Sequence, residues 1–157
     1  MAQTLATTRP AVGNEVPPQI ISLRTQLVSC GHTKNLLSQT ENLSFHIHCY
    51  GPKGGENGLH AHVEEDHVFV VLQGEAQFCG LDGPLPVLRK NQALMLPKGC
   101  FYSFSNEGSE PLVMIRFGAQ QRDADSGRLD PAGKPIAGRG KQAGSKPPVY
   151  IENAFFE

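Results

Sequence analysis

Apolar and polar side chains alternate most regularly over residues 43–50. Phe45, Ile47 and Cys49 form the apolar set. The residues between and after them are His46, His48 and Tyr50. Successive side chains of a strand point to opposite faces, so this alternation predicts a β-strand. One face of that strand is apolar, and the other carries two histidines.

Further short runs of β-branched and aromatic residues recur every 8 to 12 residues and end at clusters of glycine, proline or serine. They cover residues 20–28, 67–73, 75–79, 87–90, 93–96, 101–104 and 111–117. Regularly spaced short strands of this kind are typical of sandwiches and barrels. The sequence therefore predicts an all-β domain.

The distribution of glycine, proline and large apolar residues divides the chain into three parts. Residues 1–16 show no period of either a strand or a helix and are expected to form a flexible N-terminal arm. Residues 17–117 hold the predicted barrel. Residues 118–157 form a C-terminal arm that is rich in glycine and proline up to residue 148 and ends in the apolar segment 149–156, which we expect to dock on the barrel or on a neighbouring subunit.

Composition and charge exclude several classes of protein. A chain of 157 residues fits one domain with tails, and 14 basic against 15 acidic residues provide no positive field for nucleic acid or anionic membranes. No apolar run has the length of a membrane span, and the first residues lack the pattern of a signal peptide. We expect a cytoplasmic protein whose four cysteines, Cys30, Cys49, Cys79 and Cys100, are reduced.

Three of the six histidines cluster near one predicted turn. His60 and His62 have the spacing that puts two side chains on one face of a strand, and His67 begins the next strand. Three neutral imidazoles that converge in this way can bind a transition metal. A solvated loop with incidental histidines is the alternative interpretation of a His-x-His pair.

The wider spacing resembles two motifs of the cupin superfamily. Gly54-x5-His60-x-His62-x4-His67-x6-Gly74 is similar to the first motif, and Pro97-x-Gly99-x2-Tyr102-x3-Asn106 is similar to the second. The resemblance covers residues 54–106. It implies a cupin-type double-stranded β-helix, a jelly-roll barrel with extended terminal arms, that holds a small metal site in its mouth.

Two positions depart from the usual motifs. His67 stands where the family usually has a glutamate, and Tyr102 stands where it usually has a histidine. The resemblance implies His60, His62, His67 and Tyr102 as metal ligands, with Tyr102 as the catalytic candidate. Tyr102 has an alternative role as a phenol that hydrogen-bonds to a ligand histidine. A register that uses Asp66 as the replacement carboxylate is disfavoured, because strand alternation directs Asp66 away from the interior.

The substrate pocket is predicted from the remaining polar and aromatic residues of the inner faces. His46 and His48 are interpreted as pocket or subunit-contact residues rather than metal ligands. Arg116 either extends into solvent or presents its guanidinium to an anionic substrate. The expected walls are Phe69, Phe78 and Phe104.

These residues favour a mononuclear metal enzyme that acts on a small polar organic molecule. We expect one divalent transition metal ion per chain, Fe(II) first and otherwise Mn, Ni, Zn or Cu, and dioxygenase chemistry before isomerase, lyase or decarboxylase chemistry. A non-catalytic metabolite-binding cupin and a metal-free epimerase-type cupin are the alternatives. Since residues 68–72 are apolar on both faces and related cupins commonly pair through outer sheet faces, we also expect a homodimer.

Overall fold

The computed structural model describes residues 17–120, 127–136 and 146–157, which form strands and turns without a helix. The strands of the first half are β1 (Thr25–Cys30), β2 (His32–Gln39), β3 (Leu43–Tyr50), β4 (Gly55–His62), β5 (Glu65–Gln73), β6 (Glu75–Gly80) and β7 (Gly83–Pro84). Those of the second half are β8 (Leu88–Arg89), β9 (Ala93–Leu96), β10 (Phe101–Ser105), β11 (Leu112–Gln120), β12 (Arg128–Leu129), β13 (Pro135–Ile136) and β14 (Val149–Phe156). The predicted all-β class is confirmed.

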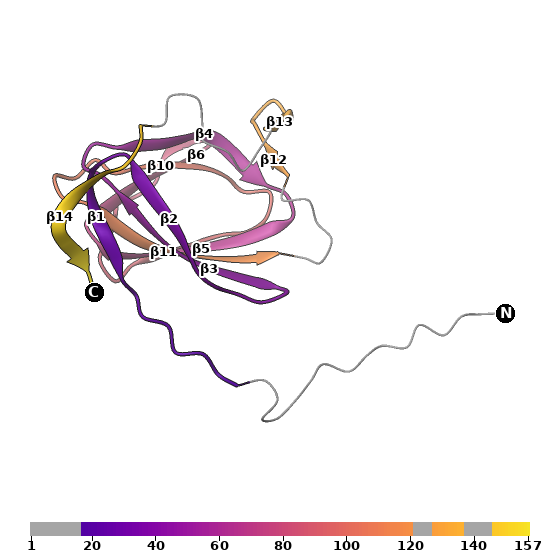
Figure 1. Cartoon of the computed structure of the whole chain (residues 1–157). Helices are drawn as coiled ribbons and strands as arrows, with labels where there is room; N and C mark the ends of the chain where they lie inside the picture. The colour runs from indigo at the N-terminus through magenta and orange to yellow at the C-terminus, as the bar shows by residue number, and fades with distance from the viewer. Residues whose placement is uncertain (1–16, 121–126, 137–145) are drawn as a thin grey trace.

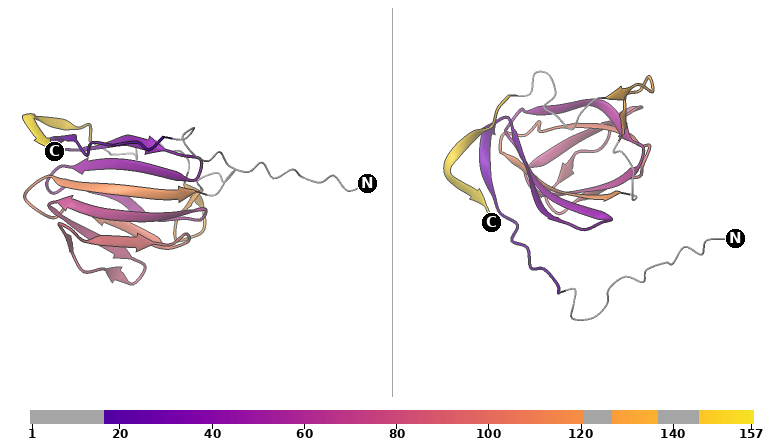
Figure 2. Two further views of the ribbon diagram at one scale, coloured as in Figure 1. Left: turned by 90° about the horizontal axis from the view of Figure 1, so that it is seen from below. Right: turned by 45° about the vertical axis from the view of Figure 1, so that its right-hand side comes forward.

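Two sheets wrap around a common interior (Figure 1). One has the order β2-β3-β11-β5-β9, and the other has the order β13-β12-β4-β10-β6-β7, with β8 paired to β6. The left view of Figure 2 shows β11 in orange between β3 and β5. The first sheet therefore brings strands from the beginning, middle and end of the barrel side by side.

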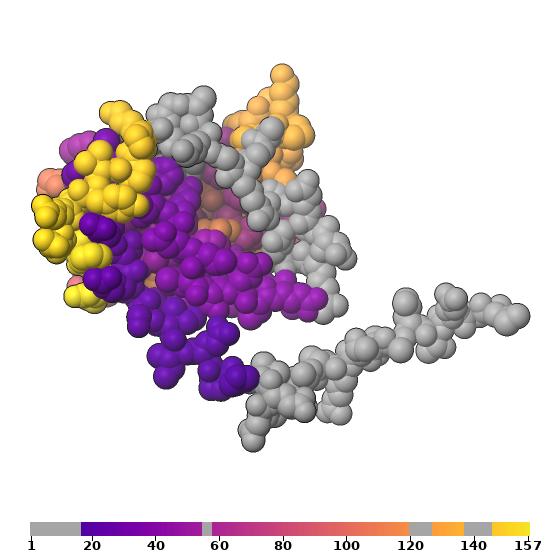
Figure 3. Space-filling model, in the orientation of Figure 1, coloured from indigo at the N-terminus to yellow at the C-terminus, as the bar shows by residue number. Residues whose placement is uncertain are grey.

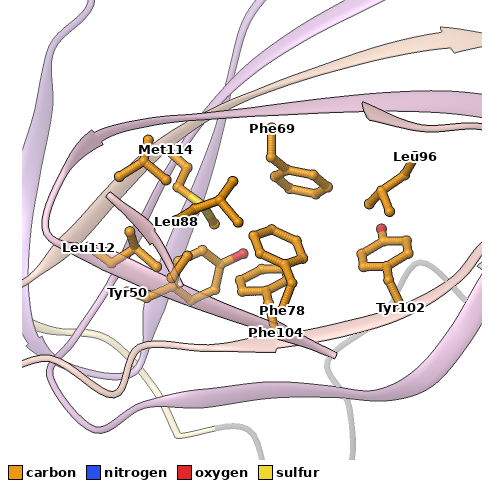
Figure 4. Packing of buried hydrophobic residues seen from close by; sticks show 11 residues of the cluster. Tyr50, Phe69, Phe78, Leu88, Leu96, Tyr102, Phe104, Leu112 and Met114 are labelled. Atoms are coloured by element: carbon orange, nitrogen blue, oxygen red, sulfur yellow. The ribbon is translucent and has the colours of Figure 1, made fainter. Parts of the chain in front are cut away.

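The interior between the sheets is filled mainly by aromatic side chains. Phe69 extends from one sheet toward Phe78 and Phe104 of the other, with ring centroids 5.5 Å from each (Figure 4). All three side chains are at most 4% exposed. Burial of each such ring stabilises the fold by about 1.5 to 3 kcal/mol, so these phenylalanines have a structural role whatever else they contact.

A smaller apolar cluster covers the outer face of the first sheet. Val28 of β1 packs with Ile47 and Cys49 of β3 and with Val113 of β11, and all four are completely buried. This placement agrees with the alternation in β3. The apolar face of β3 points away from the barrel interior and is buried because a further layer of strands covers it. Strands β1 and β14 provide that layer, at the left of Figures 1 and 3.

The C-terminal strand β14 pairs with β1 in an antiparallel two-stranded sheet. Phe156 packs against the outer cluster, and the Arg24 guanidinium lies 3.7 Å from the centre of the Phe155 ring. The barrel strand β11 runs past residue 117 to Gln120, and β12 pairs with β4. The predicted arm of residues 1–16 lies outside the described residues.

Asn106, the last residue of the second motif, holds two turns of the barrel together. Its side-chain amide donates to the carbonyl oxygens of Tyr50, Gly51 and Glu110 at 2.9 to 3.2 Å, and its oxygen accepts from the Gly108 N–H at 3.0 Å. The residue is 1% exposed. One buried amide thus ties the end of β3 to the turn between β10 and β11.

Gly74 closes the first motif and joins β5 to β6. Its φ of 75° lies in the left-handed region, and a Cβ there would lie 3.0 Å from the Pro111 carbonyl oxygen. Glycine is therefore needed both for the turn and for the close approach of the backbone at the start of β11. No helix among the described residues is long and apolar enough to cross a membrane.

Candidate metal centre

The clustered histidines lie where the end of β4 meets the beginning of β5. The ring centroids of His62 and His67 are 4.3 Å apart, and those of His60 and His62 are 5.2 Å apart. Tyr102 of β10 lies directly across from His60 in the strand register. The structure therefore brings together all four residues that the motifs single out.

His60 is buried and held by its own strand. Its Nδ1 lies 2.9 Å from the Gly58 carbonyl oxygen, which can only accept a hydrogen bond. The proton must therefore be on Nδ1, and Nε2 carries the free electron pair. Burial lowers the pKa of His60, which favours this neutral form. A histidine whose one nitrogen is bonded to a carbonyl has the tautomer and orientation that metal-binding histidines use.

His62 carries a buried nitrogen without a partner. Its Nδ1 forms no hydrogen bond to the described residues and lies 3.8 Å from Glu65 Oε2. Burial, followed by the neighbouring His67 and His60, lowers its pKa to about 3. The imidazole is therefore neutral at physiological pH. An unpaired buried nitrogen is costly unless a ligand such as a metal ion completes its bonding.

The structure adds Glu65, which the motif analysis did not select. Its Oε2 lies 3.1 Å from His67 Nε2, and its side chain is 6% exposed. Glu65 lies two residues before His67, so the same alternation that directs His67 inward also directs Glu65 inward. Asp66 points outward, where it accepts a hydrogen bond from the Lys98 backbone N–H at 2.7 Å. The alternation of side chains along β5 is thus the feature of the sequence that indicates Glu65.

Neighbouring side chains keep the carboxyl group of Glu65 ionised. Burial alone would raise the pKa of this carboxyl group, but the hydrogen bond to His67 and the positive charge of Arg116 outweigh it and lower the pKa to about 2. Glu65 is therefore an anion over the whole physiological range. The group therefore combines one carboxylate with neutral imidazoles.

His62, Glu65 and His67, which we call the metal group, have ligand atoms that all lie within 4.8 Å of one another. Two donors bonded to the same metal at about 2.1 Å are separated by roughly 3 Å, which is close to the spacing of Glu65 Oε2 and His67 Nε2. The separation of 3.8 Å to His62 needs only a small rotation. The residues fit a transition metal by donor chemistry and by the unpaired nitrogen of His62.

Tyr102 contacts a histidine of this group through its hydroxyl. The oxygen lies 3.1 Å from His67 Nδ1, and the ring centroid lies 4.6 Å from that of His60. Figure 4 shows Tyr102 beside Leu96 at one end of the aromatic core. This contact supports the role of Tyr102 as the residue that orients His67, and it leaves His67 Nε2 facing Glu65.

Arg116 of β11 lies inside the barrel rather than in solvent. Its Nη2 is paired with Glu65 Oε1 and lies 2.8 Å from His67 Nε2, and its side chain is 17% exposed. His67 Nε2 cannot accept from Arg116 and donate to Glu65 at the same time. Arg116 and Glu65 therefore compete for this nitrogen. The ion pair between Arg116 and Glu65 does not depend on which of them it contacts.

The second pair of histidines lies on the inner face of β3, outside the metal group. His46 is directly across from Arg116, and His48 is directly across from Met114. His48 is 4% exposed, and its Nδ1 lies 3.0 Å from the Tyr50 hydroxyl. The predicted wall residues Phe69, Phe78 and Phe104 belong to the aromatic core beside these histidines.

The chain matches a known protein family. The family described as a cupin domain matches residues 46–117. Residues 46–117 form a cupin domain. This match confirms the predicted family, and the two sheets confirm the double-stranded β-helix. The matched range contains every residue of the metal group. Comparison with curated proteins gives no match.

Solved structures resemble this cupin at the level of the fold. A conserved double-stranded β-helix protein from Klebsiella pneumoniae has a TM-score of 0.54 at 17% identity, covering 63% of this chain and 83% of that one. The cupin domain of Cnp3 from Schizosaccharomyces pombe has a TM-score of 0.53 at 20% identity, covering 57% and 65%. KdgF from a Halomonas species has a TM-score of 0.51 at 15% identity, covering 70% and 94%.

Within the cupin pattern, Glu65 compensates for the departure at His67. The usual glutamate position holds His67, but the carboxylate is not lost from the centre, because Glu65 supplies it from the same face of the same strand. The candidate ligand group therefore keeps one negative charge. With His60, His62 and His67, the site again offers three histidines and one carboxylate, the donor types that the two motifs usually supply.

Proposed function

We propose that this cupin binds one divalent transition metal ion through His62, Glu65 and His67, with His60 as a further ligand, and acts on a small polar organic substrate. The observation that carries the proposal is the buried His62 Nδ1, which has no hydrogen-bond partner in the described part of the chain and faces a carboxylate and a second imidazole. Neutral imidazoles this close are tolerated when an ion shares their electron pairs.

Histidines combined with one carboxylate favour Fe(II), because a donor set of this kind, with or without His60, leaves coordination positions open for oxygen and substrate. We therefore keep dioxygenase-type oxidoreductase chemistry as the first reaction class. A bound Fe(II) would supply oxygen activation, whereas Mn, Ni, Zn or Cu at the same ligands would supply Lewis-acid chemistry for an isomerase, lyase or decarboxylase.

The chain's own residues would prepare this centre. Tyr102 orients His67 through its hydroxyl, and Arg116 holds one oxygen of Glu65 so that the other faces the histidines. The aromatic core excludes water from one side of the group, which strengthens these polar contacts. The hydroxyl of Tyr102 is also close enough to His67 for a proton to move between them.

Elemental analysis of protein purified without a histidine tag tests the proposal. About one equivalent of a transition metal is expected in the wild type, and little in His62→Ala. His32→Ala is the matched control, since His32 stacks on Tyr50 outside the metal group. An equal metal content in wild type and His62→Ala, at any level, contradicts the proposal.

The contact between His67 and Tyr102 also favours a second candidate, a metal-free acid–base enzyme of the epimerase type. A hydroxyl 3.1 Å from an imidazole nitrogen is suited to passing a proton to and from a substrate. This candidate predicts turnover that survives chelation and is lost in Tyr102→Phe. Ligand binding without turnover in either state would instead identify a non-catalytic binding cupin.

A further inference from the structure

A second group of polar side chains lies on the inner face of the first sheet, beside the metal group. It consists of Arg116 on β11 and of His46 and His48 on β3, the neighbouring strand (Figure 2). The ring centroids of the two histidines are 6.1 Å apart. Because His46 and Arg116 are directly across from each other, the three side chains share one side of the barrel interior.

Each of the three carries a buried nitrogen that has no hydrogen-bond partner among the described residues. These atoms are Arg116 Nε, His46 Nδ1 and His48 Nε2. Buried polar atoms are nearly always paired in folded proteins, and an unpaired one costs about 1 to 3 kcal/mol. Three on adjacent positions of two strands indicate a site that is completed by a ligand.

The chemistry of the group selects an anion. The Glu65 contact uses Arg116 Nη2, so the Nε–H remains available on the same guanidinium. A guanidinium presents five N–H donors, and its preferred partner is a carboxylate or phosphate oxygen. A neutral imidazole donates one hydrogen bond, so each histidine can add a donor toward the same oxygen atoms. Burial, followed by the charge of Arg116, lowers the pKa of His46, in keeping with a neutral ring.

The charge balance of the adjacent metal group points in the same direction. Arg116 and Glu65 cancel each other, so a bound divalent ion would leave the interior with a net positive charge. Desolvated positive charge in an apolar barrel favours an anionic ligand. This step rests on the proposed function, whereas the three unpaired nitrogens do not.

We propose that Arg116, His46 and His48 form a subsite that binds a carboxylate group, and that the substrate of this cupin is a small organic acid. Glu65 holds the guanidinium in place through Nη2, and the ligand carboxylate accepts a hydrogen bond from the Nε–H. The acid is thereby positioned with its remaining atoms toward His67 and the metal group, since Arg116 contacts both.

Binding of lactate and of its uncharged isostere lactamide tests this subsite in the full-length chain. Dissociation constants are measured by ligand-observed NMR in chelator-treated protein and again after loading with Zn²⁺. The wild type is expected to prefer lactate over lactamide, and Arg116→Met is expected to reduce that preference by about tenfold or more. Arg116→Lys should retain part of it.

A second variant guards against misfolding, because Arg116→Met leaves Glu65 without its counter-charge. His46→Phe removes one donor, leaves the Glu65 pair in place, and should weaken lactate binding by about 3- to 10-fold with no effect on lactamide. Equal binding of the two compounds by the wild type, no binding of either, or an unchanged preference in both variants overturns the proposal. A preference for lactate in the chelated protein without any metal uptake would support the subsite and contradict only the metal proposal.

Discussion

Gly118 of β11 lies against the carboxylate of Glu65, so closely that a methyl group at residue 118 would overlap Glu65 Oε1. The same methyl group would lie 2.6 Å from Arg116 Nη2. Gly118 is not among the glycines with a positive φ, so its role is to leave space. Two residues beyond Arg116, the missing side chain makes room for the ion pair that orients the metal group.

Gly118→Ala is therefore expected to displace Glu65 and weaken metal binding by about 10- to 100-fold, the usual effect of disturbing a group that orients a ligand. A competition titration with a chromophoric chelator measures the dissociation constant. Gly80→Ala is the matched control, because its nearest contact would be an ordinary 3.7 Å to the Phe101 carbonyl oxygen. Equal metal affinities in the two variants would contradict the role of Gly118.

Tyr102→Phe is expected to keep the fold, because the ring still fills its place in the aromatic core. Loss of the hydroxyl removes the 3.1 Å contact to His67 and should change metal affinity or turnover by about 10- to 100-fold. Tyr50→Phe makes the same chemical change beside His48, outside the metal group, and should leave metal affinity near the wild-type value. If the two variants bind metal alike, Tyr102 does not orient a ligand.

Asn106→Ala is expected to destabilise the fold by about 2 to 4 kcal/mol, since it leaves several buried backbone groups without partners. Urea denaturation followed by circular dichroism gives the free energy of unfolding. Asn42→Ala, at an exposed position between β2 and β3, should change it by less than about 0.5 kcal/mol. A wild-type midpoint in Asn106→Ala would exclude this structural role.

Acid should destabilise the metal-free protein through the histidine group. The pKa of His62 falls from 6.5 to about 3 on folding, so between these values the unfolded chain binds a proton that the folded chain does not. Unfolding free energy therefore falls as pH decreases below 6.5, by up to about 1.4 kcal/mol per pH unit for this residue. Glu65, with its pKa lowered to about 2, adds a loss of the same sign below pH 4.5.

Urea denaturation at a series of pH values measures this dependence. His62→Gln should reduce the slope between pH 6.5 and 4.5 by about one proton equivalent, while His32→Gln should leave it unchanged. A wild-type slope in His62→Gln would show that this imidazole is not kept neutral by burial.

The alternation of side chains along the strands predicts which residues share a face of the sheet. The alternation in β3 correctly separated the outward Ile47 and Cys49 from the inward His48, because a strand has only two faces. The alternation in β5 likewise places Glu65 on the same face as His67, because the two residues are separated by one position. The motif spacing, in contrast, points only to position 67 and its neighbour Asp66, and it does not indicate Glu65.

The sequence by itself determined the all-β class, the cupin pattern and the clustering of His60, His62 and His67, because these depend on side-chain alternation and short-range spacing. Only the tertiary structure decided that Arg116 pairs with Glu65, that Tyr102 contacts His67 and that Gly118 leaves room for the ion pair. Those contacts join residues 35 to 53 positions apart, between β5 and its neighbour β11 or between β5 and β10 of the other sheet. Local pattern selects the face of each strand, but the partner across the sheet depends on the register between strands.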